Sequence, residues 1–418
     1  MNIQLPIPSF DLSYQELVEP KHSLVNYVKH LNLGRIEQVI ENFYSGQGPK
    51  GFRKISFFLL DLFKLKKNIS SNRKLIEEIK QQKLLQHLAF LAFKDRRKRY
   101  IRRKRIPTHQ LLSFYHRKLG ITGFRQLLAL SVEEANELGL LEPAVKQYRQ
   151  GIHLAQDSTF TPTKITSDRF NKDAKFKSFV AFGRSHKYKF PLGQRIHWLI
   201  TVPKRIIVNL MVVKASAQDF NFTIPLTETF MKRHNIKVAY HIGDKGLSDD
   251  ETRKYLFENH DIVSIYPLKE NAVYPDSFSD VGWPLCPKGY PLKRKGSDYK
   301  RKRTQYYCDR RCAENTDVSS RCEHFNSSKI QGYTFFTHFQ NGLGKFGPVH
   351  QKTVRFKKLY NTRVLTEQIN SLAKCIRYHF EENLTATDPQ EVEIQALIYA
   401  IVLNYDEIVK ERLRLEHI

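Results

Sequence analysis

Apolar residues recur at three- and four-residue intervals through much of the first 150 residues. This spacing is typical of amphipathic helices, and it is clearest at 22–43, 55–65, 73–93 and 108–121. The pattern predicts that residues 1–150 form an all-α region.

The pattern changes near residue 151 to short runs rich in β-branched residues, which predict strands. Five such runs occur, at 152–160, 196–202, 206–213, 237–244 and 262–268. The first three follow one another, whereas a helical stretch precedes each of the last two. Three strands, a helix, a strand, a helix and a strand predict an α/β domain with a mixed five-stranded sheet flanked by helices.

Residues 270–350 interrupt this rhythm with proline, glycine, tyrosine, lysine and cysteine, and predict an inserted β-rich or irregular module. Two helical stretches follow. The predicted organisation is therefore a helical region at 1–150, the first part of the α/β domain at 151–269, the inserted module at 270–350 and helices completing the domain at 351–418.

The chain of 418 residues carries a formal charge of +27. So large an excess suits a polyanionic partner, and nucleic acid is the first candidate because neutralising phosphates releases counterions. An anionic membrane surface is the rival, but no apolar run is long enough to span a bilayer and we find no amphipathic anchor. The polar start does not resemble a signal peptide, and five cysteines favour a reducing cytoplasm.

The segment 95–105 is the most basic in the helical region. Its cations are Arg96, Arg97, Lys98, Arg99, Arg102, Arg103, Lys104 and Arg105. We interpret it as a phosphate-binding segment, which makes residues 1–150 a DNA-binding region. The alternative is a solvated arm. No helix-turn-helix pattern identifies a helix that reads bases.

The segment 359–374 predicts an amphipathic helix with an unusual polar edge. At about 100° per residue, Tyr360, Arg363, Glu367 and Lys374 lie within about 60° of one another, nearly opposite the apolar face. One carboxylate is thus framed by two cations and a phenol. The alternative is a solvated face with an intrahelical ion pair.

Two aspartates follow or end predicted strands. Asp157 lies at the end of the first strand, and Asp244 at the end of the fourth, between Gly243 and Gly246, which allow a sharp turn. If those strands are neighbours, both carboxylates lie at the same edge of the sheet, and Glu367 could join them. Three converging carboxylates favour Mg²⁺ or Mn²⁺. The alternative for each aspartate alone is a turn or a helix cap.

The spacing Y-x2-R-x3-E-x6-K, with QDST around Asp157 and GDKG around Asp244, resembles a family of bacterial insertion-sequence transposases. These proteins have a DDE active site on an RNase H-like fold of the retroviral integrase superfamily. The resemblance covers residues 150–415, including the insertion between the second aspartate and the glutamate.

The resemblance implies a DNA transposase that binds terminal inverted repeats and catalyses DNA cleavage and strand transfer with Mg²⁺, for which Mn²⁺ can substitute. The metal-binding catalytic residues would be Asp157, Asp244 and Glu367. The phosphate-binding residues would be Tyr360, Arg363 and Lys374. The partners would be double-stranded DNA, both transposon ends and target, and a second copy of the chain, in the bacterial cytoplasm at the nucleoid. Two alternatives stay open: a catalytically inactive DNA-binding descendant, and a metal-dependent nuclease of the same fold.

The predicted module holds four of the five cysteines, Cys286, Cys308, Cys312 and Cys322. Thiolates suit a structural Zn²⁺ site, with His324 as a substitute ligand, although only the Cys308-x3-Cys312 spacing is typical of a ligand pair. The alternative is four reduced cysteines.

The strip 293–303, with tyrosines at 290, 299, 306 and 307, predicts a surface for nucleic-acid backbone contact and base stacking. In related transposases an aromatic residue of the insertion stacks on a flipped base. Trp283 could do so here, and the alternative for it is a core tryptophan.

Overall fold

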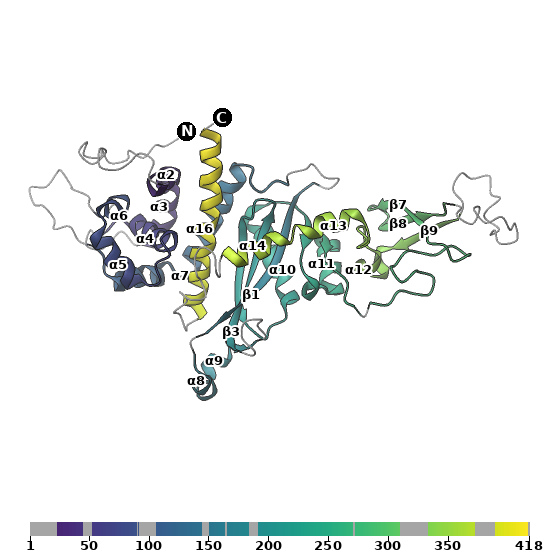
Figure 1. Ribbon diagram of the computed structural model, residues 1–418, viewed down its shortest axis with the longest axis horizontal. Coiled ribbons are helices and arrows are strands. Elements are labelled where there is room, and N and C mark those ends of the chain that lie inside the picture. Colours follow the sequence, from purple (N-terminus) through teal and green to yellow (C-terminus); the bar gives the residue numbers. More distant parts are fainter. Residues whose placement is uncertain are drawn as a thin grey trace, which may run out of the picture.

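The computed structural model of the chain (Figure 1) describes residues 23–44, 52–89, 91, 106–143, 150–163, 165–183, 191–270, 272–309, 333–372 and 389–416.

Every described element before the sheet is a helix. These helices are α2 (Ser23–Lys29), α3 (Leu33–Glu41), α4 (Lys54–Lys66), α5 (Asn72–Gln81), α6 (Lys83–Leu88) and α7 (His109–Glu137). Side-chain caps begin several of them: Asn32, Ser71 and Thr108 each accept a hydrogen bond from a first-turn backbone N–H. The long helix α7 is interrupted at Gly120, where φ is 58°.

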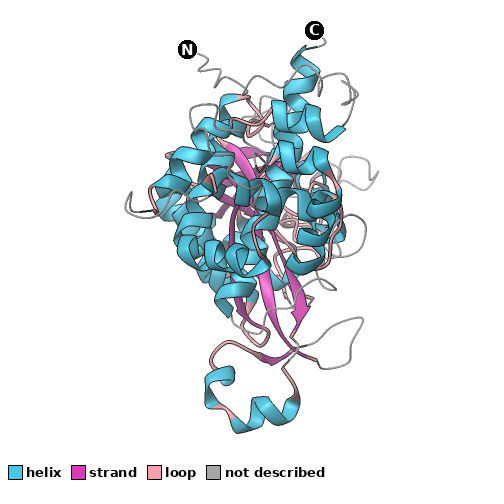
Figure 2. Ribbon diagram, turned by 90° about the vertical axis from the view of Figure 1, so that its left-hand side faces the viewer, coloured by secondary structure: helices cyan, strands magenta, loops and turns pink. Residues whose placement is uncertain are grey.

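The predicted α/β domain contains a mixed sheet flanked by helices (Figure 2). Its strands are β1 (Ile152–Pro162), β2 (Ala181–Phe182), β3 (Leu192–Val202), β4 (Ile207–Lys214), β5 (Val238–Ile242) and β6 (Val263–Ile265). Strand β1 pairs antiparallel with β3 and parallel with β5; β3 pairs antiparallel with β4, and β5 parallel with β6.

The sheet has six strands where the sequence predicted five, because β2 also pairs with β3. Strand β2 has only two residues, too few to produce a recognisable alternation of apolar and polar positions. The other five strands lie where the β-branched runs placed them.

Helices cover the sheet and fill its connections. Short helices α8 (Ser167–Lys172) and α9 (Ala174–Lys177) lie between β1 and β2, at the bottom of Figure 1. The 3₁₀ helix η1 (Asp219–Phe222) and α10 (Thr223–His234) follow β4, while η2 (Lys245–Leu247) and α11 (Asp250–His260) follow β5. None of the described helices is long and apolar enough to cross a membrane.

The C-terminal helix α16 (Pro389–Glu416) lies between the N-terminal helices and the sheet (Figure 1). It packs on α4, α7 and β4, and its centre is buried on all sides, from Ala396 to Val402. Its buried Asn404 accepts a hydrogen bond from the Ile207 N–H at 2.8 Å and donates to the Ile207 carbonyl at 2.8 Å and to Ser131 Oγ at 2.9 Å. This helix is therefore part of the core.

A separate three-stranded antiparallel sheet lies between residues 293 and 338, at the opposite end of the molecule from α5 (Figure 1). Its strands are β7 (Lys293–Asp298), β8 (Arg303–Tyr307) and β9 (Thr334–His338). A small core of Cys286, Leu292, Tyr306 and Cys308 packs beside it. The short helices η6 (Phe339–Asn341) and α12 (Leu343–Phe346) then return the chain to the main sheet.

The single helix predicted from residue 359 is divided in the structure. Helix α13 (Val354–Asn361) ends before Thr362, and α14 (Val364–Ser371) begins after Arg363. At this junction the hydroxyls of Thr362 and Thr366 donate to carbonyls three residues earlier, at 2.6 and 2.7 Å. Backbone N–H groups there also bond three residues back. These bonds tighten the turn and compete with α-helical pairing.

Candidate active site

Asp157 lies within β1, where the strand's pairing with β5 has just ended. The sequence placed it at the end of the strand, but β1 continues to Pro162 because its antiparallel pairing with β3 is longer. The last β1–β5 pair joins Ala155 to Ile242. Asp157 is therefore at the carboxyl edge of the parallel part of the sheet, although the strand itself continues.

Asp244 lies at the equivalent position beyond β5. Both aspartates come two residues after the Ala155–Ile242 pair. Neighbouring strands are about 4.8 Å apart, so the register brings both residues to the same edge of the sheet. The two carboxylates were predicted to lie at the same edge of the sheet if the first and fourth predicted strands were neighbours. These strands, β1 and β5, are neighbours.

The turn at Asp244 is shaped by close packing. A Cβ atom on Gly243 would lie 2.3 Å from Leu247 Cδ1, and one on Gly246 would lie 3.1 Å from Asp244 Oδ1. The Asp244 carboxylate also caps η2, accepting from the Leu247 N–H at 3.3 Å. Gly243 thus leaves room for the buried Leu247 side chain and Gly246 leaves room beside the Asp244 carboxylate. The cap proposed as an alternative role for Asp244 is present as well.

The pKa of Asp157 is affected by burial and by the charges around it. Burial is the largest cause raising its pKa to about 6, while the hydrogen bond from the Ser158 N–H lowers it. The charge of Asp244 raises the pKa of Asp157, that of Arg363 lowers it, and that of Glu367 raises it. A cation bound beside Asp157 would favour the charged form of its carboxylate.

Glu367 lies on the outer side of α14, paired with Arg363. An Nη2 of Arg363 lies 2.5 Å from Glu367 Oε1, and the Glu367 side chain is 51% exposed. The guanidinium also lies over the Tyr360 ring at 5.7 Å, and that ring stacks on Phe356 at 5.8 Å. Tyr360, Arg363 and Glu367 are thus adjacent despite the helix junction. Lys374 lies outside the residues that the structure describes.

Two residues of α14 that the sequence analysis did not select contact Asp157 directly. Asn370 Nδ2 donates to Asp157 Oδ2 at 2.9 Å, and Thr366 Oγ1 is 3.5 Å from the same oxygen. They are four residues apart, between the polar edge and the buried Ile369. The i,i+4 spacing of these two residues was the only sign in the sequence that they act together. Polar residues at the border of a helix's apolar face commonly show the same spacing.

The oxygen donors at this site are suited to a hard divalent cation. Asp157 and Asp244 supply the carboxylates. Beside them, Asn370 holds Asp157 through its amide N–H, and its buried Oδ1 has no hydrogen-bond partner among the described residues. Among the described residues, no three histidine, cysteine, aspartate or glutamate side chains are grouped closely enough to hold an ion. Glu367 would therefore have to leave Arg363 to complete a three-carboxylate site.

The remaining predicted nucleic-acid and zinc residues are only partly described. The residues outside the described ranges are Arg96, Arg97, Lys98, Arg99, Arg102, Arg103, Lys104, Arg105, Cys312, Cys322 and His324. Cys286 and Cys308 are buried in the small core of the module. The Tyr290 N–H donates to Cys286 Sγ at 3.4 Å.

The strip 293–303 exposes five cations, Lys293, Lys295, Lys300, Arg301 and Lys302. The proposed stacking role is wrong for Tyr306, which is 2% exposed and belongs to the small core. It points inward because residues alternate along β8. Trp283 is half-buried and stacks on His350 at 4.5 Å, so one face of its indole is already covered.

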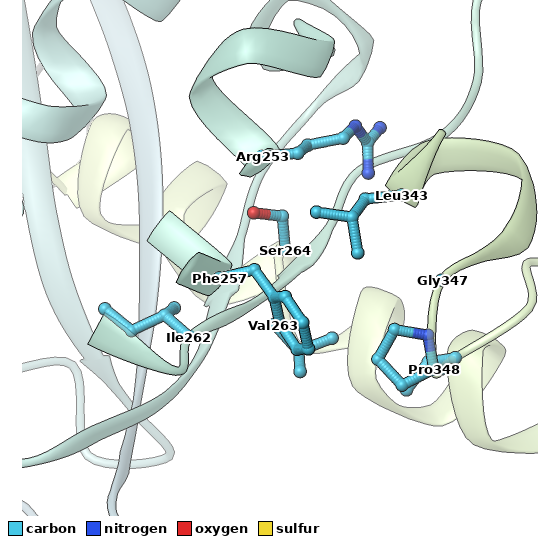
Figure 3. Close-up of a pocket in the computed structure, with 9 residues that line it drawn as sticks. Arg253, Phe257, Ile262, Val263, Ser264, Leu343, Gly347 and Pro348 are labelled. Carbon is cyan, nitrogen blue, oxygen red and sulfur yellow. The ribbon is translucent and has the colours of Figure 1, made fainter. Parts of the chain in front are cut away.

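A small cavity of about 10 Å³ lies between α11, β6 and the segment after α12 (Figure 3). Its lining comprises Arg253, Phe257, Ile262, Val263, Ser264, Leu343, Gly347, Pro348 and Val349. It has room for about one water molecule and contains none of the candidate catalytic residues. The carboxylates, and not this cavity, are the candidate active site.

No protein-family model and no curated protein sequence matches the chain. The chain is similar to the solved structure of a piggyBac transposase synaptic complex with hairpin DNA, at 9% identity and a TM-score of 0.41. The match covers 94% of this chain and 76% of that one. At this identity and score the likeness by itself assigns neither a fold nor a function.

Proposed function

We propose that this protein is a DDE DNA transposase that binds the terminal inverted repeats of an insertion sequence and catalyses metal-dependent DNA cleavage and strand transfer. The observation that carries the proposal is the register of β1 and β5, in which Asp157 and Asp244 each follow the last pair, Ala155–Ile242, by two residues. Helix α14, bearing Glu367, is attached to Asp157 through Asn370.

The sheet supports the RNase H-like part of the proposal. Strands β4, β3 and β1 form an antiparallel series, and β5 and β6 extend it in parallel from β1. Asp157 lies on β1, the strand shared by the antiparallel and parallel parts, and Asp244 follows the neighbouring β5. Ligands of open α/β sheets bind at such carboxyl edges.

The cation chemistry would be that of Mg²⁺, which activates a water or 3′-hydroxyl and stabilises the leaving oxygen in phosphodiester displacement. Asp157 and Asp244 would hold it, joined by Glu367. Ion pairing with Arg363 at 2.5 Å now occupies Glu367. A DNA phosphate that captured Arg363 bidentately would release Glu367 toward the aspartates, so substrate binding and completion of the site would be coupled.

The charge distribution supports DNA as the partner. The net charge is +27, and the helix before α14 carries exposed cations. On α13 they are Lys357 and Lys358, which share one exposed face of the helix with Val354. The proposal extends to the basic segment 95–105 and to Lys374, which would bind DNA phosphates, and to a complex in which two copies of the chain bind DNA together.

The test is Mg²⁺-dependent cleavage of DNA carrying the element's own terminal repeats, comparing wild type with Glu367→Gln. The substitution preserves shape and removes the charge. We expect cleavage by wild type only, with equal binding of the ends by both proteins. Equal cleavage would refute the assignment of Glu367. Binding without cleavage by either protein would favour the inactive descendant, and cleavage without joining to a target plasmid would favour the nuclease.

A further inference from the structure

Helix α14 is joined to the edge of β1 by a side-chain amide. Asn370 Nδ2 donates to Asp157 Oδ2 at 2.9 Å, over a sequence separation of more than 200 residues. Thr366 Oγ1 lies farther from that oxygen, at 3.5 Å, and its hydroxyl already donates to the Arg363 carbonyl at 2.7 Å. Asn370 is therefore the principal donor from α14 to the carboxylate.

This bond determines how the Asp157 carboxylate is oriented. Its other oxygen, Oδ1, accepts from the Ser158 N–H at 2.9 Å. One donor on each oxygen fixes rotation of the carboxylate about its Cβ–Cγ bond. Each oxygen keeps a further lone pair for another partner. Without Asn370, the donors remaining to this carboxylate among the described residues would be the Ser158 N–H and the long Thr366 contact.

The same bond positions the helix that carries Glu367. Asn370 and Glu367 are three residues apart, so they are neighbours on α14. The pairing of Asn370 with Asp157 therefore sets how far along β1 this turn of helix lies, and with it the point from which Glu367 reaches the aspartates. The buried Ile369 fixes the depth of the helix, but apolar contacts are not directional.

We propose that Asn370 is a positioning residue for a divalent-cation site at Asp157 and Asp244. It acts through Asp157, holding that carboxylate in the orientation that accepts the ion. The inference rests on the proposed function for the identity of the reaction, whereas cation binding can be measured without it. Outer partners that orient ligands typically change metal affinity 10–100-fold when removed.

The experiment measures Mn²⁺ binding to the full-length protein without DNA, by electron paramagnetic resonance of the free ion. The variants are Asn370→Ala, Asn370→Gln and, as a control, Gln368→Ala. Gln368 is an exposed amide on the same helix that bonds Arg205 at 3.2 Å. Thermal unfolding of every variant is measured alongside.

We expect Asn370→Ala to weaken Mn²⁺ binding at least tenfold. Gln368→Ala should bind as wild type does, and Asn370→Gln, which keeps the amide donor, should recover part of the loss. A purely structural contact would lower the melting temperature and leave Mn²⁺ affinity unchanged in the folded protein, which would overturn the proposal. Wild-type affinity in Asn370→Ala, or no Mn²⁺ binding by wild type, would do the same.

Failure of the proposed function gives a different result. If wild type binds Mn²⁺ and Asn370→Ala does not, but no DNA is cleaved, the positioning role stands and the transposase assignment fails. If DNA is cleaved and Asn370→Ala binds Mn²⁺ normally, the transposase assignment stands and the positioning role fails.

Discussion

Replacing Asn404 with leucine tests whether α16 stabilises the edge of the main sheet. Between Leu199 and Ile200 the register of β3 against β4 shifts, and the backbone of Ile207 pairs with the Asn404 side chain on both its N–H and its carbonyl. The amide thus takes the place of a neighbouring strand at this point. Leucine has a similar volume but offers neither donor nor acceptor.

The expected cost follows from the groups left unpaired. Two buried backbone groups of Ile207 lose their partner, at about 1–3 kcal/mol each. Ser131 loses one donor but keeps its own bond to the Leu128 carbonyl, so its contribution is smaller. The added apolar side chain offsets part of the total. We expect the free energy of unfolding to fall by about 3 kcal/mol.

The assay is urea unfolding followed by circular dichroism, with Asn259→Leu as the control. Asn259 is exposed on α11 and bonds only the Tyr255 carbonyl among the described groups. Its replacement should change stability by less than about 0.5 kcal/mol. If Asn404→Leu matched that control, the reasoning that α16 supplies missing sheet hydrogen bonds would be refuted.

Three further outcomes are expected. Burial lowers the pKa of His197 and of His241 to about 3, so between about pH 6.5 and 3 the unfolded chain binds protons that the folded chain does not. The free energy of unfolding should therefore decrease as the pH is lowered through this range, by up to about 1.4 kcal/mol per pH unit for each group. In His241→Gln, urea unfolding should show a weaker dependence of this free energy on pH; an equal dependence would contradict the assignment. Gly243→Ala places a carbon 2.3 Å from the buried Leu247 side chain, which would have to shift beside Asp244, and should reduce DNA cleavage; cleavage equal to that of wild type would refute the packing argument. Elemental analysis should find zinc in wild type and less in Cys308→Ser, and its absence from wild type would refute the zinc proposal.

The strands could be predicted from the sequence because burial on both faces of a sheet selects runs of β-branched residues. Their order could not. That β1 lies between β3 and β5 depends on contacts between distant segments, and the proximity of Asp157 and Asp244 depended on that order. The two-residue β2 left no periodic signal.

Part of the candidate site could be predicted, because charged and aromatic residues are grouped on one edge of a helix in an unusual way. Tyr360, Arg363 and Glu367 share an edge whether or not the helix is continuous, so the break between α13 and α14 did not disturb the grouping. Asn370 was not selected, because an asparagine on a helix boundary is common and its partner, Asp157, lies far away in the sequence. Tyr306 points inward because the module has a small core of its own, which could not be predicted from the sequence.

The position of α16 has a consequence for the order in which the protein can be assembled during synthesis. Its contacts reach both α2, where Tyr27 donates to Asp406 at 2.8 Å, and α7, where Arg412 bonds Glu134 at 2.7 Å. The helical region and the sheet are both translated before it. Until residues 389–416 have left the ribosome, α4, α7 and β4 lack the helix that packs on all three of them. The core shared by the helical region and the sheet is therefore completed only after translation of the last described helix.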